Sequence, residues 1–165
     1  MIHALQDKIV NTISNTIEED RKSRSIVVAG LAEEPRELPA SRRQSELEDK
    51  ITGILDILDV ECRPQTVYRM GMYNESKNRL VKVMLPSRSH WRRVLANAHL
   101  LRQSGMSEVF IRRSMSPEER EKEAKLRQEA HERNKAANRR DWVVYKGELK
   151  KVCEMPSRQK PVNRQ

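Results

Sequence analysis

The segment from Arg79 to Arg120 constrains the fold of this chain more than any other part of the sequence. A β-branched run (RLVKVML) is followed by an amphipathic helical pattern, a second β-branched run (EVFIRR) and a helix start at Ser116-Pro117. Within residues 76–115, nine basic side chains accompany a single acid, Glu108. Strand, helix and strand in this order, with this local charge, predict a small α+β domain that carries a basic surface.

The charge of the whole chain is distributed unevenly. Residues 1–75 hold ten basic and fourteen acidic side chains, whereas residues 76–165 hold twenty-three and ten, for a net charge of +9. A basic half beside an acidic half indicates a polyanionic partner. A membrane is not expected to be that partner, because no stretch approaches roughly 18 apolar residues and no signal-peptide pattern is present. The sequence predicts an intracellular protein, in the cytoplasm, the nucleus or both.

No pattern of cofactor or metal ligands stands out. Cys62 and Cys153 make no disulfide framework, and the four histidines are scattered, whereas zinc normally takes four ligands at short spacing. The sequence also lacks a Walker loop, a Ser/His/Asp arrangement and a carboxylate pair in an apolar setting. We expect no metal, no cofactor, no small-molecule substrate and no enzymatic activity.

Residues 1–22 predict an amphipathic helix. Its apolar residues recur at spacings of three and four, at Ile2, Leu5, Ile9, Ile13 and Ile17. This stripe resembles the two-position seam of a coiled coil, although it covers only about two and a half heptads. The helix is expected either to form a short coiled-coil stem for a homo-oligomer or to fold back onto the next domain.

Residues 23–115 predict one β-α-β-β-α-β domain. The expected strands are Arg24–Leu31, Val67–Met72, Arg79–Leu85 and Glu108–Arg113. One helix is expected to begin at Ser41, with Gln44 completing a capping box, and the other near Ser87 or Ser89. This order fits an antiparallel sheet with both helices on one side, the sandwich of RNA-recognition motifs and other ferredoxin-like domains. Many unrelated domains share it, so it does not specify a function.

Residues 116–152 predict a C-terminal helix and hairpin. Ser116 is expected to cap the helix, because Pro117 and Glu119 occupy its first and third positions. Leu126 is the one large apolar residue of the helix, which is typical of a solvated helix. The hairpin strands are expected at Asp141–Tyr145 and Glu148–Val152. The tail, residues 153–165, is expected to be disordered.

Several sequence blocks occur together in a characteristic order. They are SIVVAGL, VYRMG, RLVKVMLPS, WRRVLANAHLL, VFIRR, MSPEEREKEAKLRQEA and WVVYKGELKKV. Over about residues 10–152 the chain resembles the RNA-binding first-open-reading-frame protein of LINE-type non-LTR retrotransposons, and host proteins derived from one. The resemblance implies a coiled-coil stem, a divergent RNA-recognition motif and a small C-terminal domain. It also implies a chaperone for single-stranded RNA or DNA within a ribonucleoprotein.

The candidate binding residues are basic side chains that would follow a phosphate backbone with little sequence preference. Around the sheet and the second helix of the domain they are Arg69, Arg79, Lys82, Arg88, Arg92, Arg93, Arg112 and Arg113. Strand alternation places Lys82 and Arg112 on the open face. A second set comprises Arg139, Arg140, Lys146, Lys150 and Lys151, with Trp142 or Tyr145 available to stack on a base.

Aromatic residues are scarce where RNA-recognition motifs usually stack bases. The first and third predicted strands contain none, so charge is expected to dominate over stacking. Phe110 is expected either on the open face or in the core, Trp142 either packed or stacking, and Trp91 in the core. The alternative function is a protein–protein interaction module that does not bind nucleic acid.

Overall fold

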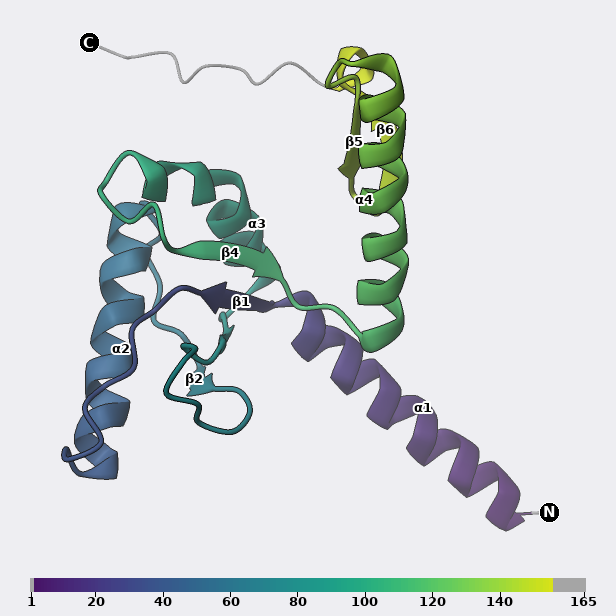
Figure 1. Ribbon diagram of the computed structural model, residues 1–165. Coiled ribbons are helices and arrows are strands. Elements are labelled where there is room, and N and C mark those ends of the chain that lie inside the picture. The colour runs from purple at the N-terminus through teal and green to yellow at the C-terminus, as the bar shows by residue number, and fades with distance from the viewer. Residues whose placement is uncertain (1, 156–165) are drawn as a thin grey trace, which may run out of the picture. The chain divides into compact units, whose positions relative to one another are not determined.

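The computed structural model describes residues 2–155 of the chain, and the side chains from residue 6 onward. From residue 156 onward, the predicted disordered tail lies outside the described residues. The chain divides into two compact units, Met1–Ser114 and Met115–Gln165, called here the first unit and the second unit (Figure 1).

The first unit contains a four-stranded antiparallel sheet in the order β2-β3-β1-β4. Its strands are β1 (Ser25–Ala29), β2 (Thr66–Arg69), β3 (Val81–Met84) and β4 (Phe110–Arg113). The helix α2 (Ala40–Ile57) joins β1 to β2, and α3 (Arg88–Asn97), extended by the 3-10 helix η1 (Ala98–Arg102), joins β3 to β4. The predicted order of elements is confirmed, and each strand is shorter than predicted.

Both helices of the sheet connections pack on one face of the sheet. The strand residues on this face include Ile26 and Val28 of β1, which lie opposite Val83 and Val81 of β3. They form one core cluster with buried residues of α2, α3 and η1, namely Leu47, Ile51, Ile54, Leu55, Val94 and Leu101. In β1 and β3, every second residue is apolar and points to the same side, so one face of the sheet is buried against the two helices.

The two helices begin differently. Ser87 caps α3 by accepting a hydrogen bond from the His90 amide, so the earlier of the two predicted start sites is correct. The capping box predicted at Ser41 is wrong, because α2 begins one residue earlier after Pro39 and no side chain caps it. The reason is tertiary: Gln44 donates instead to the Val67 carbonyl oxygen of β2 at 2.8 Å.

The N-terminal helix α1 (Ile2–Ser23) forms as predicted. The described part of its apolar stripe is open to solvent, with Ile9, Ile13 and Ile17 exposed by 51%, 54% and 47%. No helix among residues 2–155 has the length and apolar character to cross a membrane.

The second unit consists of one helix and a hairpin. Its elements are α4 (Pro117–Ala137), β5 (Trp142–Tyr145), β6 (Glu148–Lys151) and the 3-10 helix η2 (Val152–Glu154). The predicted capping box is confirmed, since Ser116 accepts from the Glu119 amide and Glu119 accepts from the Ser116 amide. The Asn134 side chain bonds both backbone groups of Trp142, which fastens the hairpin to the helix. Cys153 and Glu154, predicted as disordered tail, instead belong to η2.

Candidate nucleic-acid interface

The sheet face opposite α2 and α3, called here the open face, combines basic and aromatic side chains. The strand register places Tyr68, Lys82, Val27 and Arg112 in one row across all four strands. Lys82 and Arg112 thus lie on the predicted face. Val27, between them, is only 3% exposed and lies outside the main core cluster.

Two aromatic residues stand at the edges of the open face. Tyr68 of β2 is 46% exposed and Phe110 of β4 is 57% exposed. Phe110, for which the sequence left two positions open, therefore lies on the open face rather than in the core. Tyr68 was missed, because the expectation of stacking residues was applied only to the first and third strands. Its signal was present: Val67 is apolar and faces the core, so the next residue faces outward.

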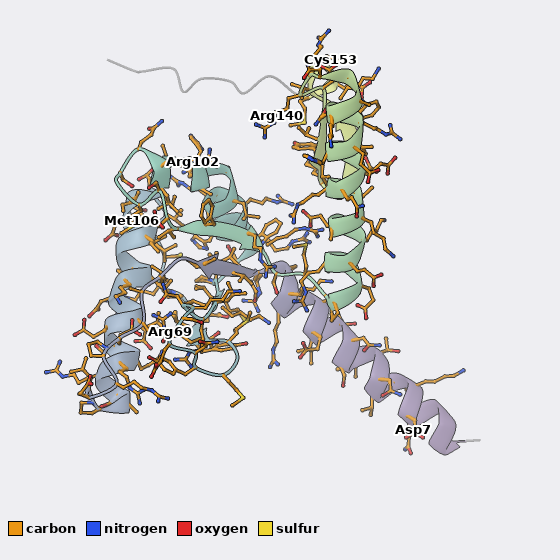
Figure 2. The ribbon with its side chains drawn as sticks, in the orientation of Figure 1. Asp7, Arg69, Arg102, Met106, Arg140 and Cys153 are labelled. Carbon is orange, nitrogen blue, oxygen red and sulfur yellow. The ribbon has the colours of Figure 1, made fainter. Side chains whose placement is uncertain are left out.

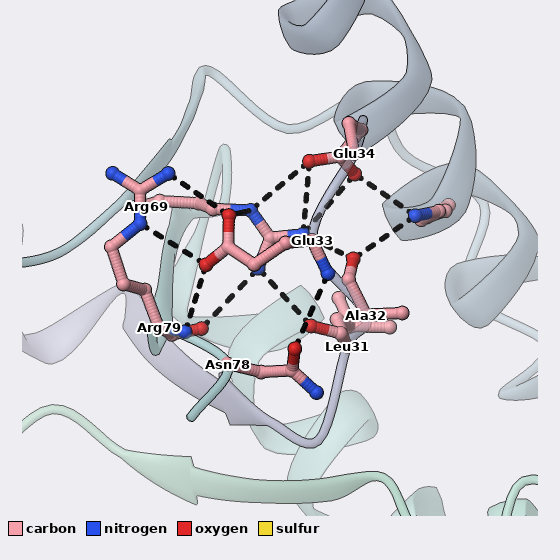
Figure 3. Close-up of polar contacts among 8 residues, drawn as sticks. Leu31, Ala32, Glu33, Glu34, Arg69, Asn78 and Arg79 are labelled. Carbon is pink, nitrogen blue, oxygen red and sulfur yellow. Dashed lines mark hydrogen bonds and ion pairs between the residues drawn. The ribbon is translucent and has the colours of Figure 1, made fainter. Parts of the chain in front are cut away.

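Two of the predicted phosphate-binding arginines are engaged in a cluster with Glu33 and Glu34 (Figure 3). Arg69 donates to Glu34 at 3.0–3.1 Å and lies 3.2 Å from Glu33. Arg79 donates to Glu33 at 2.9 and 3.1 Å. Lys50 donates to Glu34 at 3.0 Å. The cluster holds the loop after β1 against β2 and the start of β3.

The expectation that Arg69 contacts phosphate is corrected by this cluster. Its side chain is 5% exposed and lies among other side chains between α2 and the loop after β2 (Figure 2). Its guanidinium also donates to the Leu31 and Ala32 carbonyl oxygens. A guanidinium has five N–H donors, and all three nitrogens of Arg69 donate to acceptors within the first unit. Arg79 is more accessible, at 25%, but is likewise paired with Glu33.

The two glutamates of the cluster make the first unit sensitive to acid. The hydrogen bond from the Arg79 side chain lowers the pKa of Glu33 below its ordinary value of 4.5. Burial raises the pKa of Glu34, but hydrogen bonds from Lys50 and Arg69 outweigh it, so this pKa is also lowered. Carboxylates with a lowered folded-state pKa stabilise the protein above the unfolded pKa, and that stability is lost as the pH falls through the folded pKa.

We therefore expect the urea midpoint of the first unit to fall below about pH 4.5. The fall should be shallower in Glu33→Gln/Glu34→Gln, because this variant lacks the two carboxylates whose protonation destabilises the folded state at low pH. Glu46→Gln/Asp49→Asn, which removes two exposed carboxylates of α2, is the matched control and should behave as the wild type. Identical acid profiles for both double variants would contradict the role assigned to the cluster.

The remaining predicted residues of the first unit lie outside the open face. Arg88, Arg92 and Arg93 are exposed on α3, and Arg93 pairs with Asp59 at 2.6 Å. Arg113 lies opposite Ile26 in the register and therefore on the face that bears the helices. Only Lys82 and Arg112 of the first predicted set occupy the open face.

The predicted residues of the second unit surround the hairpin. Arg139, Arg140 and Lys146 are exposed. Trp142 is half-buried, with the Arg133 guanidinium 4.5 Å from its ring centroid. Arg140 and Trp142 line one pocket together with Arg127, His131, Asn134 and other residues. Tyr145 is half-buried as well, 5.3 Å from the Lys146 ammonium. Packing thus accounts for part of the Trp142 surface and leaves another part accessible.

No known protein family matches the sequence, and no curated protein matches it. Both cysteines are free thiols, and the described side chains, those of residues 6–155, include no group of three or more His, Cys, Asp or Glu that could hold a metal ion. The candidate interface therefore rests on the geometry of its own residues.

Proposed function

We propose that the first unit is an RNA-recognition-motif-like domain that binds single-stranded RNA on its open face with little sequence preference. The β-α-β-β-α-β connectivity and the strand order β2-β3-β1-β4 support this assignment. A single strand is favoured over a duplex because its bases are free to leave the stack and lie on aromatic side chains.

The observation that carries the proposal is the placement of Tyr68 and Phe110 at the two edges of the open face, with Lys82 on β3 between them and Arg112 on the same edge strand as Phe110. Neighbouring strands lie about 4.8 Å apart, so the two aromatic edges are separated by roughly 14 Å across the sheet. Bases would stack on the aromatic rings at the edges. Lys82 would neutralise phosphates that cross the centre, and Arg112 would neutralise those at the β4 edge.

The order of the sequence blocks supports a more specific proposal. We place the chain with the first-open-reading-frame RNA-binding proteins of LINE-type retrotransposons and their host derivatives, as a chaperone in an intracellular ribonucleoprotein. The second unit would add a further basic contact through Arg139, Arg140, Lys146 and Trp142. The same phosphate and stacking contacts would also allow single-stranded DNA to bind in place of RNA.

Titration of labelled oligouridine at several salt concentrations tests the proposal with two kinds of variant. Lys82→Gln/Arg112→Gln should lower the slope of log affinity against log salt by about 0.7 for each lost phosphate contact. Tyr68→Ala/Phe110→Ala should weaken binding by about 1–3 kcal/mol per stacked base and leave the salt slope unchanged.

One control removes the same number of charges as the basic variant, and the other removes one exposed apolar side chain. Arg63→Gln/Arg102→Gln removes two exposed arginines away from the open face, and Met72→Ala removes a side chain that is 93% exposed. Both should bind as the wild type does. Equal losses in the open-face and control variants, or no binding by the wild type at low salt, would refute the proposed interface.

A protein-interaction role is the second candidate. It is favoured by the exposed stripe of Ile9, Ile13 and Ile17 on α1, which is the kind of surface that packs in a helical assembly. We propose self-association through this stripe as compatible with RNA binding. Wild-type chain that sediments as an oligomer and fails to bind oligouridine would favour the interaction module over the RNA-binding domain.

A further inference from the structure

A small pocket lies at the β2 edge of the sheet, between the loop after β1 and the start of α2. It has a volume of about 270 Å³ and is lined by two glutamates and four arginines, besides two tyrosines and uncharged residues. Pockets for drug-sized ligands usually have about 300–1,000 Å³, so this one suits a smaller group. The excess of arginine over glutamate predicts that the group is an anion.

The two glutamates of the pocket do not repel an anion as free carboxylates would. Glu33 and Glu34 are held by Arg69, Arg79 and Lys50, so three cations already neutralise two acids (Figure 3). These two glutamates are therefore already neutralised. The lining contains two further arginines, Arg36 and Arg43, and neither of them is paired with Glu33 or Glu34.

Within residues 6–155, Arg43 has an unpaired buried donor, and the Arg36 side chain is held in place beside the pocket. The Arg43 Nε atom is buried and has no hydrogen-bond partner among the described residues. Buried polar groups are almost always paired, and a charged donor left without an acceptor is costly. Arg36 is held with its guanidinium 4.0 Å from the ring centroid of Tyr73, which fixes a flexible side chain at the pocket.

The start of α2 contributes to the same pocket. Ala40, its first residue, lies in the pocket wall, no side chain caps the helix, and its first turn contains no acid. The amides of an uncapped first turn carry partial positive charge and point out of the helix toward an anion. The helix start and the side chains of Arg36 and Arg43 thus line one volume.

We propose that this pocket binds a phosphate group of the RNA strand that lies on the open face. Tyr68 connects the two sites, because it lines the pocket and also stands on the open face. A base stacked on Tyr68 would bring its own phosphate to Arg36 and Arg43. The assignment to RNA rests on the proposed function, whereas the affinity of the pocket for phosphate does not.

The phosphate site is tested first with inorganic phosphate, by following the backbone amide resonances of residues 40–43 at low ionic strength. Phosphate should shift these resonances saturably, and chloride at equal ionic strength should not. Arg36→Gln/Arg43→Gln should abolish the saturable shift, while Arg63→Gln/Arg102→Gln, an exposed pair outside the pocket and outside α2, should retain it. Arg36→Gln alone, at an exposed position, should weaken it in a fold that is otherwise unchanged. Equal responses to phosphate and chloride would overturn the site.

The source of the phosphate is tested with oligouridine and the same variants. Loss of a charge-assisted contact should weaken RNA binding about tenfold in Arg36→Gln/Arg43→Gln. Arg63→Gln/Arg102→Gln should change it less than twofold. If the wild type binds oligouridine but shows no saturable response to inorganic phosphate, the phosphate site is refuted and the proposed binding of RNA on the open face still stands. Saturable phosphate binding by a wild type that binds no oligouridine overturns the RNA assignment and the proposed function together.

Discussion

Replacing Arg69 with methionine should lower the free energy of unfolding of the first unit by about 3–5 kcal/mol. Arg69 and Glu34 are each 5% exposed, so removal of the guanidinium leaves a buried carboxylate with Lys50 as its remaining cation. The Leu31 carbonyl oxygen loses its Arg69 donor as well, and the Ala32 carbonyl oxygen keeps only the hydrogen bond from Lys50. Truncating one member of a buried pair costs more than the pair contributes, because the other charge stays buried.

Urea unfolding measured by tryptophan fluorescence checks this expectation. The chain has two tryptophans, so a Trp142→Phe background leaves Trp91, which packs against the core of the first unit, as the reporter. Arg63→Met, at an exposed loop position, is the control and should change stability by less than about 0.5 kcal/mol. Arg69→Met/Glu34→Met should recover part of the loss, since apolar groups can replace a buried pair. A loss from Arg69→Met below about 1 kcal/mol would contradict the structural role of the pair.

Gly30→Ala should destabilise the first unit by about 3 kcal/mol or more. Gly30 directly follows β1 and has a φ of +88°, in the left-handed region that residues with a side chain rarely adopt. An added Cβ atom would also lie 1.9 Å from the Glu108 carbonyl oxygen, so the backbone before β4 would have to move. Strain and overlap therefore act together at this position.

Gly71→Ala separates the two causes. Gly71 has a nearly equal φ of +82°, but an added Cβ atom would meet no atom within 4 Å. Its substitution should cost about 1–2 kcal/mol from backbone strain alone. Urea midpoints of the two variants in the Trp142→Phe background measure the difference. Equal losses at Gly30 and Gly71 would show that the approach of Glu108 has no energetic consequence.

Local patterns account for the elements that were predicted correctly. The alternation in RLVKVML identified Val81 and Val83 as core residues and Lys82 as outward, and the register agrees. The serine at position 116, with glutamate three residues later, likewise predicted a cap that forms. Such features depend on neighbours within one turn or one strand, so they can be read from the sequence.

Local patterns could not predict the partners of Arg69 and Arg79. Arg69 bonds Glu34 across 35 positions and Arg79 bonds Glu33 across 46. Positive charge near a strand predicts a basic surface only when no acid lies beside it in space. The failed cap at Ser41 has the same origin, because Gln44 is drawn to β2 by a contact 23 residues away.

The sequence by itself determined the order of helices and strands, the buried faces of β3 and β4 and the basic character of residues 76–115. Periodicity and charge are properties of neighbouring residues, and they persist in any tertiary arrangement that buries the apolar face. The tertiary structure decided which basic residues remain available. The loop after β1 folds so that Glu33 and Glu34 pair with Arg69 and Arg79. The same folding places Arg36, Arg43 and Tyr68 around one pocket. Contacts between distant segments follow from the way the loops close, and no local pattern encodes that closure.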